Sequence, residues 1–120
     1  KVNARRRHNA SLYHELLDPL HVFMPPERKI EHNTWHTFVI QIERREALKA
    51  WLAEKGIETA VHYPVPLHLQ PAAIELGYRE GDMPETERQA ARILTLPVNQ
   101  FLKDEDIEFV ANAVNRFFAA

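Results

Sequence analysis

The sequence predicts an α+β domain of two layers, in which a short, mainly antiparallel sheet has helices packed on one face. The first observation behind this prediction is that apolar residues recur at helical spacing near both ends and in the middle of the chain. The second is that runs rich in β-branched and aromatic residues are few and short. With 120 residues, 45% of them hydrophobic, the chain fits one domain covering residues 1–120.

The first helix is expected within Lys1–Asp18, a stretch without glycine or proline, and Pro19 ends it. One face of this helix can pack, because apolar residues fall at helical spacing at Ala10, Tyr13, Leu16 and Leu17. A short strand is expected at His21–Met24, and the stretch from Pro25 to Asn33 is expected to be a loop.

The strongest strand prediction is Thr34–Ile42, which is rich in aromatic and β-branched residues. Alternation along a strand divides its side chains between two faces. The expected core face carries His36, Phe38, Ile40 and Ile42. The opposite face would carry Trp35, Thr37, Val39 and Gln41.

The hydrophobic period changes to that of a helix at Glu43–Lys55. Its apolar stripe consists of Ala47, Leu48, Trp51 and Leu52. Lys55 suits the negative end of this helix, and Gly56 suits the left-handed position that follows it. We therefore expect this helix to end at Gly56.

The second half of the chain is expected to begin with a short strand at Thr59–Tyr63. Short helices are expected at Pro71–Leu76 and Pro84–Ile93, and a short strand at Leu94–Val98. The clearest helix is Asp104–Phe118. Its apolar stripe runs through Ile107, Val110, Ala111, Val114, Phe117 and Phe118.

Composition argues against several classes of function. The formal net charge of −2 gives no strong field that would attract nucleic acid or an anionic membrane surface. The lack of cysteine excludes disulfides, thiolate catalysis and cysteine metal ligands, and favours a cytoplasmic setting. No apolar run approaches the ~20 residues that span a bilayer. We expect neither a nucleic-acid nor a membrane partner.

One loop concentrates side chains that can carry chemistry. Pro64, Pro66 and Pro71 stiffen it. Its ring side chains that can hydrogen-bond are His62, Tyr63 and His68. Rigid loops that follow strands often carry binding groups, whereas the plain alternative is that these residues only pack and hydrogen-bond.

Other chemistries find little support in the residues. His62 and His68 could bind a metal with Glu58 or Asp82, but their spacing matches no recognised zinc pattern. The only serine lies in a polar helix, and the three glycines form no phosphate loop. The residues by themselves therefore predict an α+β domain with one notable loop, and no reaction.

A family resemblance adds to this reading. The stretch Gly56–Val98 reads GIETAVHYPVPLHLQPAAIELGYREGDMPETERQAARILTLPV. It resembles the C-terminal small domain of the sugar-nucleotide aminotransferases of DegT type, which are pyridoxal-phosphate enzymes of fold type I. Three further stretches are similar to that domain: RRRHNASLYHELL, TWHTFVIQ and LKDEDIEFVANAVNRFF. The chain departs mildly from the family at Lys103, where relatives often have a helix-capping Thr or Ser, so capping is expected from Asp104.

The resemblance implies that an amino group moves from glutamate to a keto-sugar linked to a nucleotide. Pyridoxal phosphate would be the cofactor, held by a lysine of a large domain in a homodimeric enzyme. None of the five lysines sits in a context that resembles the family's lysine motif. We therefore expect the chain to be the last third of such an enzyme, inactive and without bound cofactor by itself.

The resemblance assigns no catalytic or cofactor-binding residue to this chain. It implies that His62 and His68, the two histidines of the family's loop motif, bind substrate together with Tyr63. The surface that meets the large domain is expected to include Trp35, Val39 and the edge formed by Leu12 and Leu16. Two alternatives stay open: a binding or regulatory module that has lost the chemistry, and a metal site built on His62 and His68.

Overall fold

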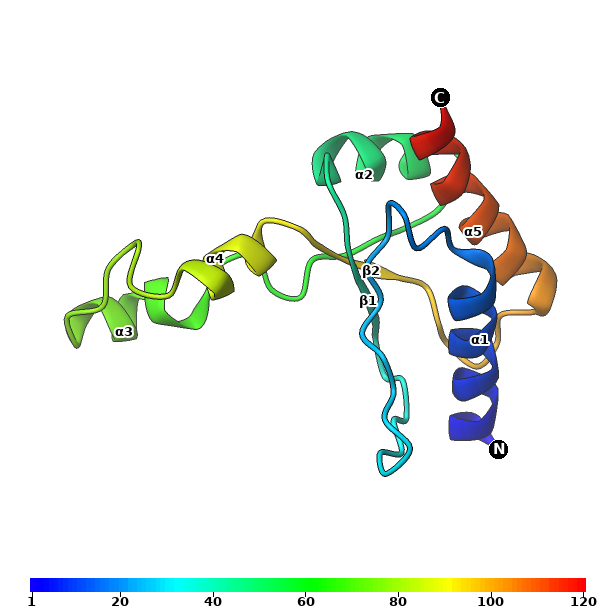
Figure 1. Cartoon of the computed structure of the whole chain (residues 1–120), viewed down its shortest axis with the longest axis horizontal. Helices are drawn as coiled ribbons and strands as arrows, with labels where there is room; N and C mark the ends of the chain where they lie inside the picture. Colours follow the sequence, from blue (N-terminus) through cyan, green and yellow to red (C-terminus); the bar gives the residue numbers. More distant parts are fainter.

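The computed structural model describes residues 1–120 and combines helices with one two-stranded sheet (Figure 1). In chain order its elements are α1 (Val2–Leu16), β1 (Phe38–Gln41), α2 (Arg45–Glu54), the 3-10 turn η1 (Leu67–Leu69), α3 (Pro71–Glu75), α4 (Pro84–Ala90), β2 (Ile93–Leu96) and α5 (Asp104–Ala119). No helix is both long enough and apolar enough to cross a membrane. The predicted α+β class is confirmed.

The sheet is antiparallel and pairs two strands that lie far apart in the sequence. Phe38 of β1 faces Leu96 of β2, and Gln41 faces Ile93. The segments His21–Met24 and Thr59–Tyr63, which were predicted to be strands, each form only one isolated β-bridge. These bridges pair Phe23 with Gln41 and Ala60 with Thr95. Prolines follow both segments, and a proline cannot donate the hydrogen bond that would extend a ladder.

Three helices enclose the core on one side of the strands. α1 and α5 lie side by side, and α2 crosses near the C-terminal end of α5 (Figure 1). The buried cluster includes Phe38 and Ile40 of β1 and Ile42 just after it, as alternation predicted. Tyr13 of α1 meets Phe38 with ring centroids 4.8 Å apart. Burial of these large side chains is the main driving force for folding of the helices and sheet around this core.

The predicted alternation fails at the start of β1. Trp35 has φ of +53° and is buried against Phe38, with ring centroids 5.3 Å apart. The Asn33 side chain accepts a hydrogen bond from the Trp35 backbone N–H, and Arg6 donates to the carbonyl groups of Trp35 and His36. This turn ends the strand pattern, so His36 is exposed instead of lying on the core face.

Two predicted helix ends also differ from the structure. Lys103 is the N-cap of α5, and its backbone N–H donates to the Asp106 carboxylate at 2.8 Å. Asp104 does not cap, because its carboxylate binds Arg5 of α1 at 2.7 Å. α4 ends at Ala90 because Ile93 pairs with Gln41 in the sheet.

Residues 62–91 form an arm that extends away from the helices and sheet, which we call the body (Figure 1). The arm contains η1, α3 and α4, and the whole molecule measures 47 × 37 × 24 Å. No residue of the arm belongs to the buried core cluster. The arm is therefore joined to the body only at its base, where the predicted binding loop begins.

Candidate functional site

Three hydrogen bonds fix the start of the arm, and the residues just before it, to β2. Thr95 and Ala60 exchange backbone hydrogen bonds of 2.7 and 3.3 Å. The Thr95 hydroxyl lies 2.8 Å from Nδ1 of His62. Thr95 is itself buried, so it sets the orientation of the His62 ring. His62 Nε2 makes no hydrogen bond within the chain, which leaves this nitrogen free to meet a ligand.

Tyr63 stands beside His62 and faces solvent. The two ring centroids lie 5.4 Å apart, with the ring planes at 83°. Tyr63 is 72% exposed, which is high for an aromatic residue, and its hydroxyl has no partner in the chain. The pair presents one imidazole nitrogen and one phenol hydroxyl on a fixed backbone. Both groups can donate or accept a hydrogen bond.

His68 lies in a different setting, inside the arm. It is 4% exposed, and its Nε2 lies 2.8 Å from a carboxylate oxygen of Glu87 in α4. The same carboxylate oxygen accepts the backbone N–H of Gly81 at 2.8 Å. The hydrogen bond from His68, supported by that from Gly81, holds the pKa of the Glu87 carboxyl below its usual value. This cluster ties η1, the Gly81 turn and α4 together.

The other ring nitrogen of His68, Nδ1, is buried and has no hydrogen-bond partner. Buried polar atoms are nearly always paired, so this atom is an unusual feature of the arm. The Glu87 carboxylate can only accept, so Nε2 carries the proton of that hydrogen bond. Because Nδ1 is buried, a group from outside the chain would reach it only after the surrounding arm residues move.

The structure thus brings His62 and Tyr63 together at the surface. His68 differs from them, because it is buried and bonds to Glu87. Two residues of this region were missed in the sequence, Thr95 and Glu87. Neither gives a sequence signal, because their partners lie 33 and 19 residues away. No group of three His, Cys, Asp or Glu side chains is placed to hold a metal ion.

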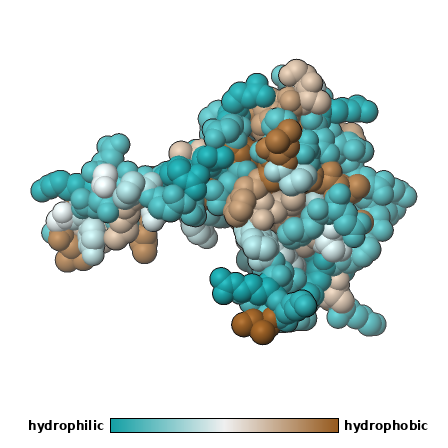
Figure 2. All heavy atoms as spheres, in the orientation of Figure 1, coloured by the Kyte–Doolittle hydropathy of each residue, from teal (hydrophilic) through white to brown (hydrophobic).

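The arm also exposes apolar side chains. Figure 2 shows hydrophobic atoms gathered along its lower side. The large apolar residues that the arm exposes are Tyr63, Val65, Leu67, Ile74, Leu76, Tyr78 and Met83. A gathering of exposed apolar side chains often marks a site of contact with another protein surface.

The residues present do not fit a pyridoxal-phosphate cradle. Such a site needs a lysine for the Schiff base and a group that pairs with the pyridine nitrogen. None of the five lysines is buried. Lys49 is bonded to Glu46 at 3.4 Å, and Lys55 lies over the Trp51 ring at 3.6 Å.

Comparisons with known proteins agree with the resemblance in the sequence. The model of the DegT/DnrJ/EryC1/StrS aminotransferase family matches residues 1–115. A protein of Geobacillus stearothermophilus named "Pleiotropic regulatory protein" is 38% identical over 117 residues, covering 95% of this chain and 32% of its own length. The dTDP-3-amino-3,6-dideoxy-alpha-D-galactopyranose transaminase of Aneurinibacillus thermoaerophilus is 34% identical over 115 residues, covering 96% of this chain and 31% of its own.

A solved structure shows the same fold. It is DesV of S. venezuelae in complex with a ketimine intermediate, with a TM-score of 0.91 and 34% identity over 97% of this chain. The match covers 32% of the DesV chain, so the present chain spans about a third of the length of the relatives it matches. On the family match over residues 1–115, the chain belongs to the DegT/DnrJ/EryC1/StrS aminotransferase family.

Proposed function

We propose that this chain is one domain of a longer pyridoxal-phosphate-dependent aminotransferase that moves an amino group from glutamate to a nucleotide-linked keto-sugar. Two observations support the proposal: the relatives are about three times as long, and one of them is named as a transaminase of a dTDP-sugar. The rest of the polypeptide would hold the cofactor, because no lysine here is placed for it. We further propose that the intact enzyme works as a homodimer.

Within that enzyme, the arm would form part of the wall of the sugar-nucleotide site. The observation that carries this role is the exposed Tyr63 beside His62, whose ring is fixed by Thr95. His62 Nε2 and the Tyr63 hydroxyl would hydrogen-bond the sugar or the diphosphate. His68 would bind substrate through Nδ1 once movement of the arm exposes this atom, while its other nitrogen keeps the arm in shape through Glu87.

The test is single-turnover kinetics of each half-reaction in the full-length enzyme, with His62→Ala and His68→Ala. A hydrogen bond to a neutral group contributes roughly 0.5–1.5 kcal/mol and one to a charged group roughly 1.5–3 kcal/mol. We therefore expect kcat/KM for the keto-sugar to fall by about threefold to a hundredfold. The half-reaction with glutamate should change little, because it does not need the sugar contacts.

His36→Ala is the matched control, since His36 is an exposed histidine outside the arm. Its two half-reactions should keep the parent rates. If His62→Ala and His68→Ala melt normally and retain the sugar half-reaction at the parent rate, neither histidine binds substrate. A lower melting temperature with equal losses in both half-reactions would instead assign them a packing role.

The 120-residue chain by itself should not catalyse amino transfer. Without a Schiff-base lysine, covalent catalysis lacks its first step. The measurement is to mix the chain with pyridoxal phosphate, reduce with borohydride, and identify labelled peptides after digestion. One specifically labelled lysine, together with amino transfer from glutamate, would contradict this expectation.

A second function is favoured by one observation, the name "Pleiotropic regulatory protein" of the Geobacillus relative. Under this alternative, the full-length protein would bind a ligand or a protein without transferring an amino group. The half-reaction kinetics separate the two functions, because a regulatory module would show no turnover with glutamate.

A further inference from the structure

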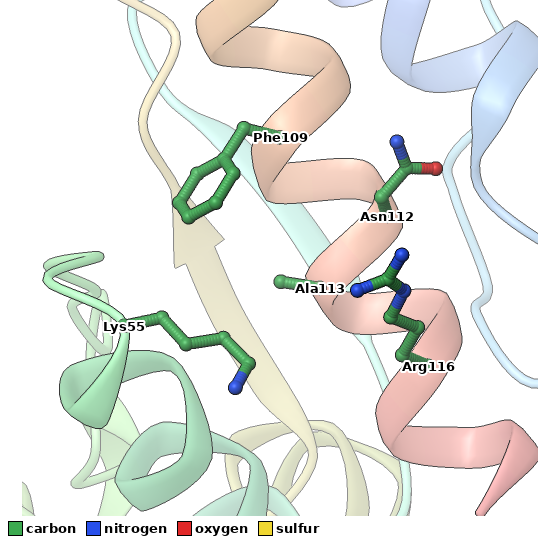
Figure 3. A pocket seen from close by; sticks show the side chains of 5 residues that line it. All are labelled: Lys55, Phe109, Asn112, Ala113 and Arg116. Atoms are coloured by element: carbon green, nitrogen blue, oxygen red, sulfur yellow. The ribbon is translucent and has the colours of Figure 1, made fainter.

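A pocket lies outside the arm, between the C-terminal end of α2 and α5 (Figure 3). Its volume is about 330 Å³, within the range of small-molecule sites. It is lined by Lys55, Phe109, Asn112, Ala113 and Arg116. The four residues from α5 follow the spacing i, i+3, i+4 and i+7, so one stripe of this helix forms one wall.

A hydrogen bond between α2 and α5 holds the two walls of the pocket together. The Trp51 indole N–H donates to the Ala113 carbonyl at 2.9 Å, which joins α2 to α5 at the floor of the pocket. The Lys55 ammonium lies 3.6 Å from the centroid of the Trp51 ring, a cation–π contact. Ala113 lies between Lys55 and Arg116 and carries only a methyl group, so its own side chain leaves this part of the pocket open (Figure 3).

The lining is positive and its donors are unpaired. None of the five residues is acidic, and neither Lys55 nor Arg116 takes part in the nine ion pairs of the chain. The Asn112 amide and the Arg116 guanidinium make no side-chain hydrogen bond within the chain. Both cations lie near helix C-termini, whose partial negative charge favours them but does not satisfy their N–H donors.

We propose that this pocket binds a small soluble phosphate ester. Lys55 and Arg116 lie on opposite sides of Ala113 (Figure 3), so an anion bound between them would receive charge-assisted hydrogen bonds from both. Arg116 offers the planar fork that matches phosphate oxygens, and Asn112 adds an amide donor on the same side of α5. Phe109 is 54% exposed at the edge of the pocket and provides an apolar wall for the organic part of the ester.

The experiment titrates the 120-residue chain with two probes, inorganic phosphate and phenyl phosphate, followed by NMR. The expected result is saturable shifts of the Asn112 side-chain amide, the Arg116 Nε–H and the Trp51 indole N–H. Phenyl phosphate should bind more tightly, because its ring can contact Phe109. Phe109→Ala should remove this difference and leave the affinity for inorganic phosphate unchanged.

Arg116→Gln and Lys55→Gln should each weaken phosphate binding by about tenfold, the effect of one charge-assisted hydrogen bond in a partly open pocket. The matched controls are Arg79→Gln and Lys103→Gln, whose side chains are exposed and outside the pocket. Both controls should bind like the parent chain.

Three results would overturn the proposal: no saturable shift up to tens of millimolar phosphate, affinity that Arg116→Gln leaves intact, or equal losses in the controls. The last result would indicate general attraction of anions to the surface. None of these measurements requires aminotransferase activity. The pocket proposal can therefore fail without affecting the function proposed for the arm.

Discussion

At the scale of single residues, the two histidines of the arm differ through their partners. The hydroxyl of Thr95 orients His62 at the surface, whereas His68 is buried against the Glu87 carboxylate. Both were equally good candidates in the sequence, because they have the same side chain in the same proline-rich loop. They differ because His62 contacts β2, whereas His68 contacts α4. We therefore expect the arm's shape to depend on Glu87.

Glu87→Gln should loosen the arm without unfolding the body. Gln retains an oxygen acceptor but loses the charge that strengthens the hydrogen bonds from His68 and Gly81. Hydrogen exchange of arm amides around η1 should become several-fold faster, while amides of α5 keep their protection. Glu85→Gln is the matched control, since Glu85 lies on the same helix and contacts neither residue.

The same carboxylate gives the arm a pH dependence of known sign. The pKa of Glu87 in the folded chain lies below its usual value of 4.5. Its stabilising effect is therefore complete above that usual value and is lost as the pH falls through the lowered pKa. The measurement is hydrogen exchange of the arm amides at decreasing pH, in the parent chain and in Glu87→Gln. If acid speeds this exchange equally in both, Glu87 is not the source of the pH dependence.

At the scale of elements, α1 and α5 are joined by hydrogen bonds as well as by apolar contact. Asn115 of α5 donates to the Leu16 carbonyl at 2.8 Å, and its amide oxygen accepts the Asp18 N–H at 3.0 Å. The first bond satisfies the Leu16 carbonyl at the C-terminal end of α1, which no intrahelical N–H can reach, and the second satisfies the Asp18 N–H just beyond that end. The helices themselves were predictable from local periodicity. The residue that joins them was not, because Asn115 falls between the apolar positions of the stripe.

Asn115→Ala should lower the free energy of unfolding by about 1–3 kcal/mol, because it leaves the Leu16 carbonyl and the Asp18 N–H without their partner. Asn112→Ala serves as the control, since Asn112 lies on the same helix, is exposed and bonds to no protein group. Urea unfolding followed by circular dichroism measures both. Equal stability of the two variants would mean that the Asn115 hydrogen bonds contribute nothing net.

At the scale of the whole molecule, the exposed apolar surface lies elsewhere than the sequence predicted. Trp35 is 6% exposed, Val39 and Leu12 are half-buried, and only Leu16 remains exposed, at 37%. The arm instead exposes Leu67 and several other large apolar side chains. An arm without its own apolar core needs a second surface to cover these residues. In the proposed enzyme, that surface belongs to the rest of the polypeptide.

The 120-residue chain should therefore self-associate through the arm. Leu67→Gln combined with Leu76→Gln, at positions 78% and 80% exposed, should shift the chain toward monomer. Leu20→Gln combined with Ile30→Gln removes two body residues of similar exposure, 80% and 92%, and should leave association unchanged. Sedimentation velocity over a range of concentrations provides the measurement. A parent chain that stays monomeric throughout would contradict the prediction.

By itself, the sequence determined the α+β class, the long helices and the core side of β1. These features follow from spacing within one segment, as at Phe38, Ile40 and Ile42, or from one residue's backbone freedom, as at Gly56 with φ of +75°.

Tertiary structure alone decided the rest. Trp35 is buried because Asn33 and Arg6 bind the backbone of a turn that strand alternation does not anticipate. Thr95 and Glu87 enter the site only because folding brings them to residues 33 and 19 positions away. Hydrogen bonds between distant segments leave no periodic trace in a sequence, and it is these bonds that shape the arm and its site.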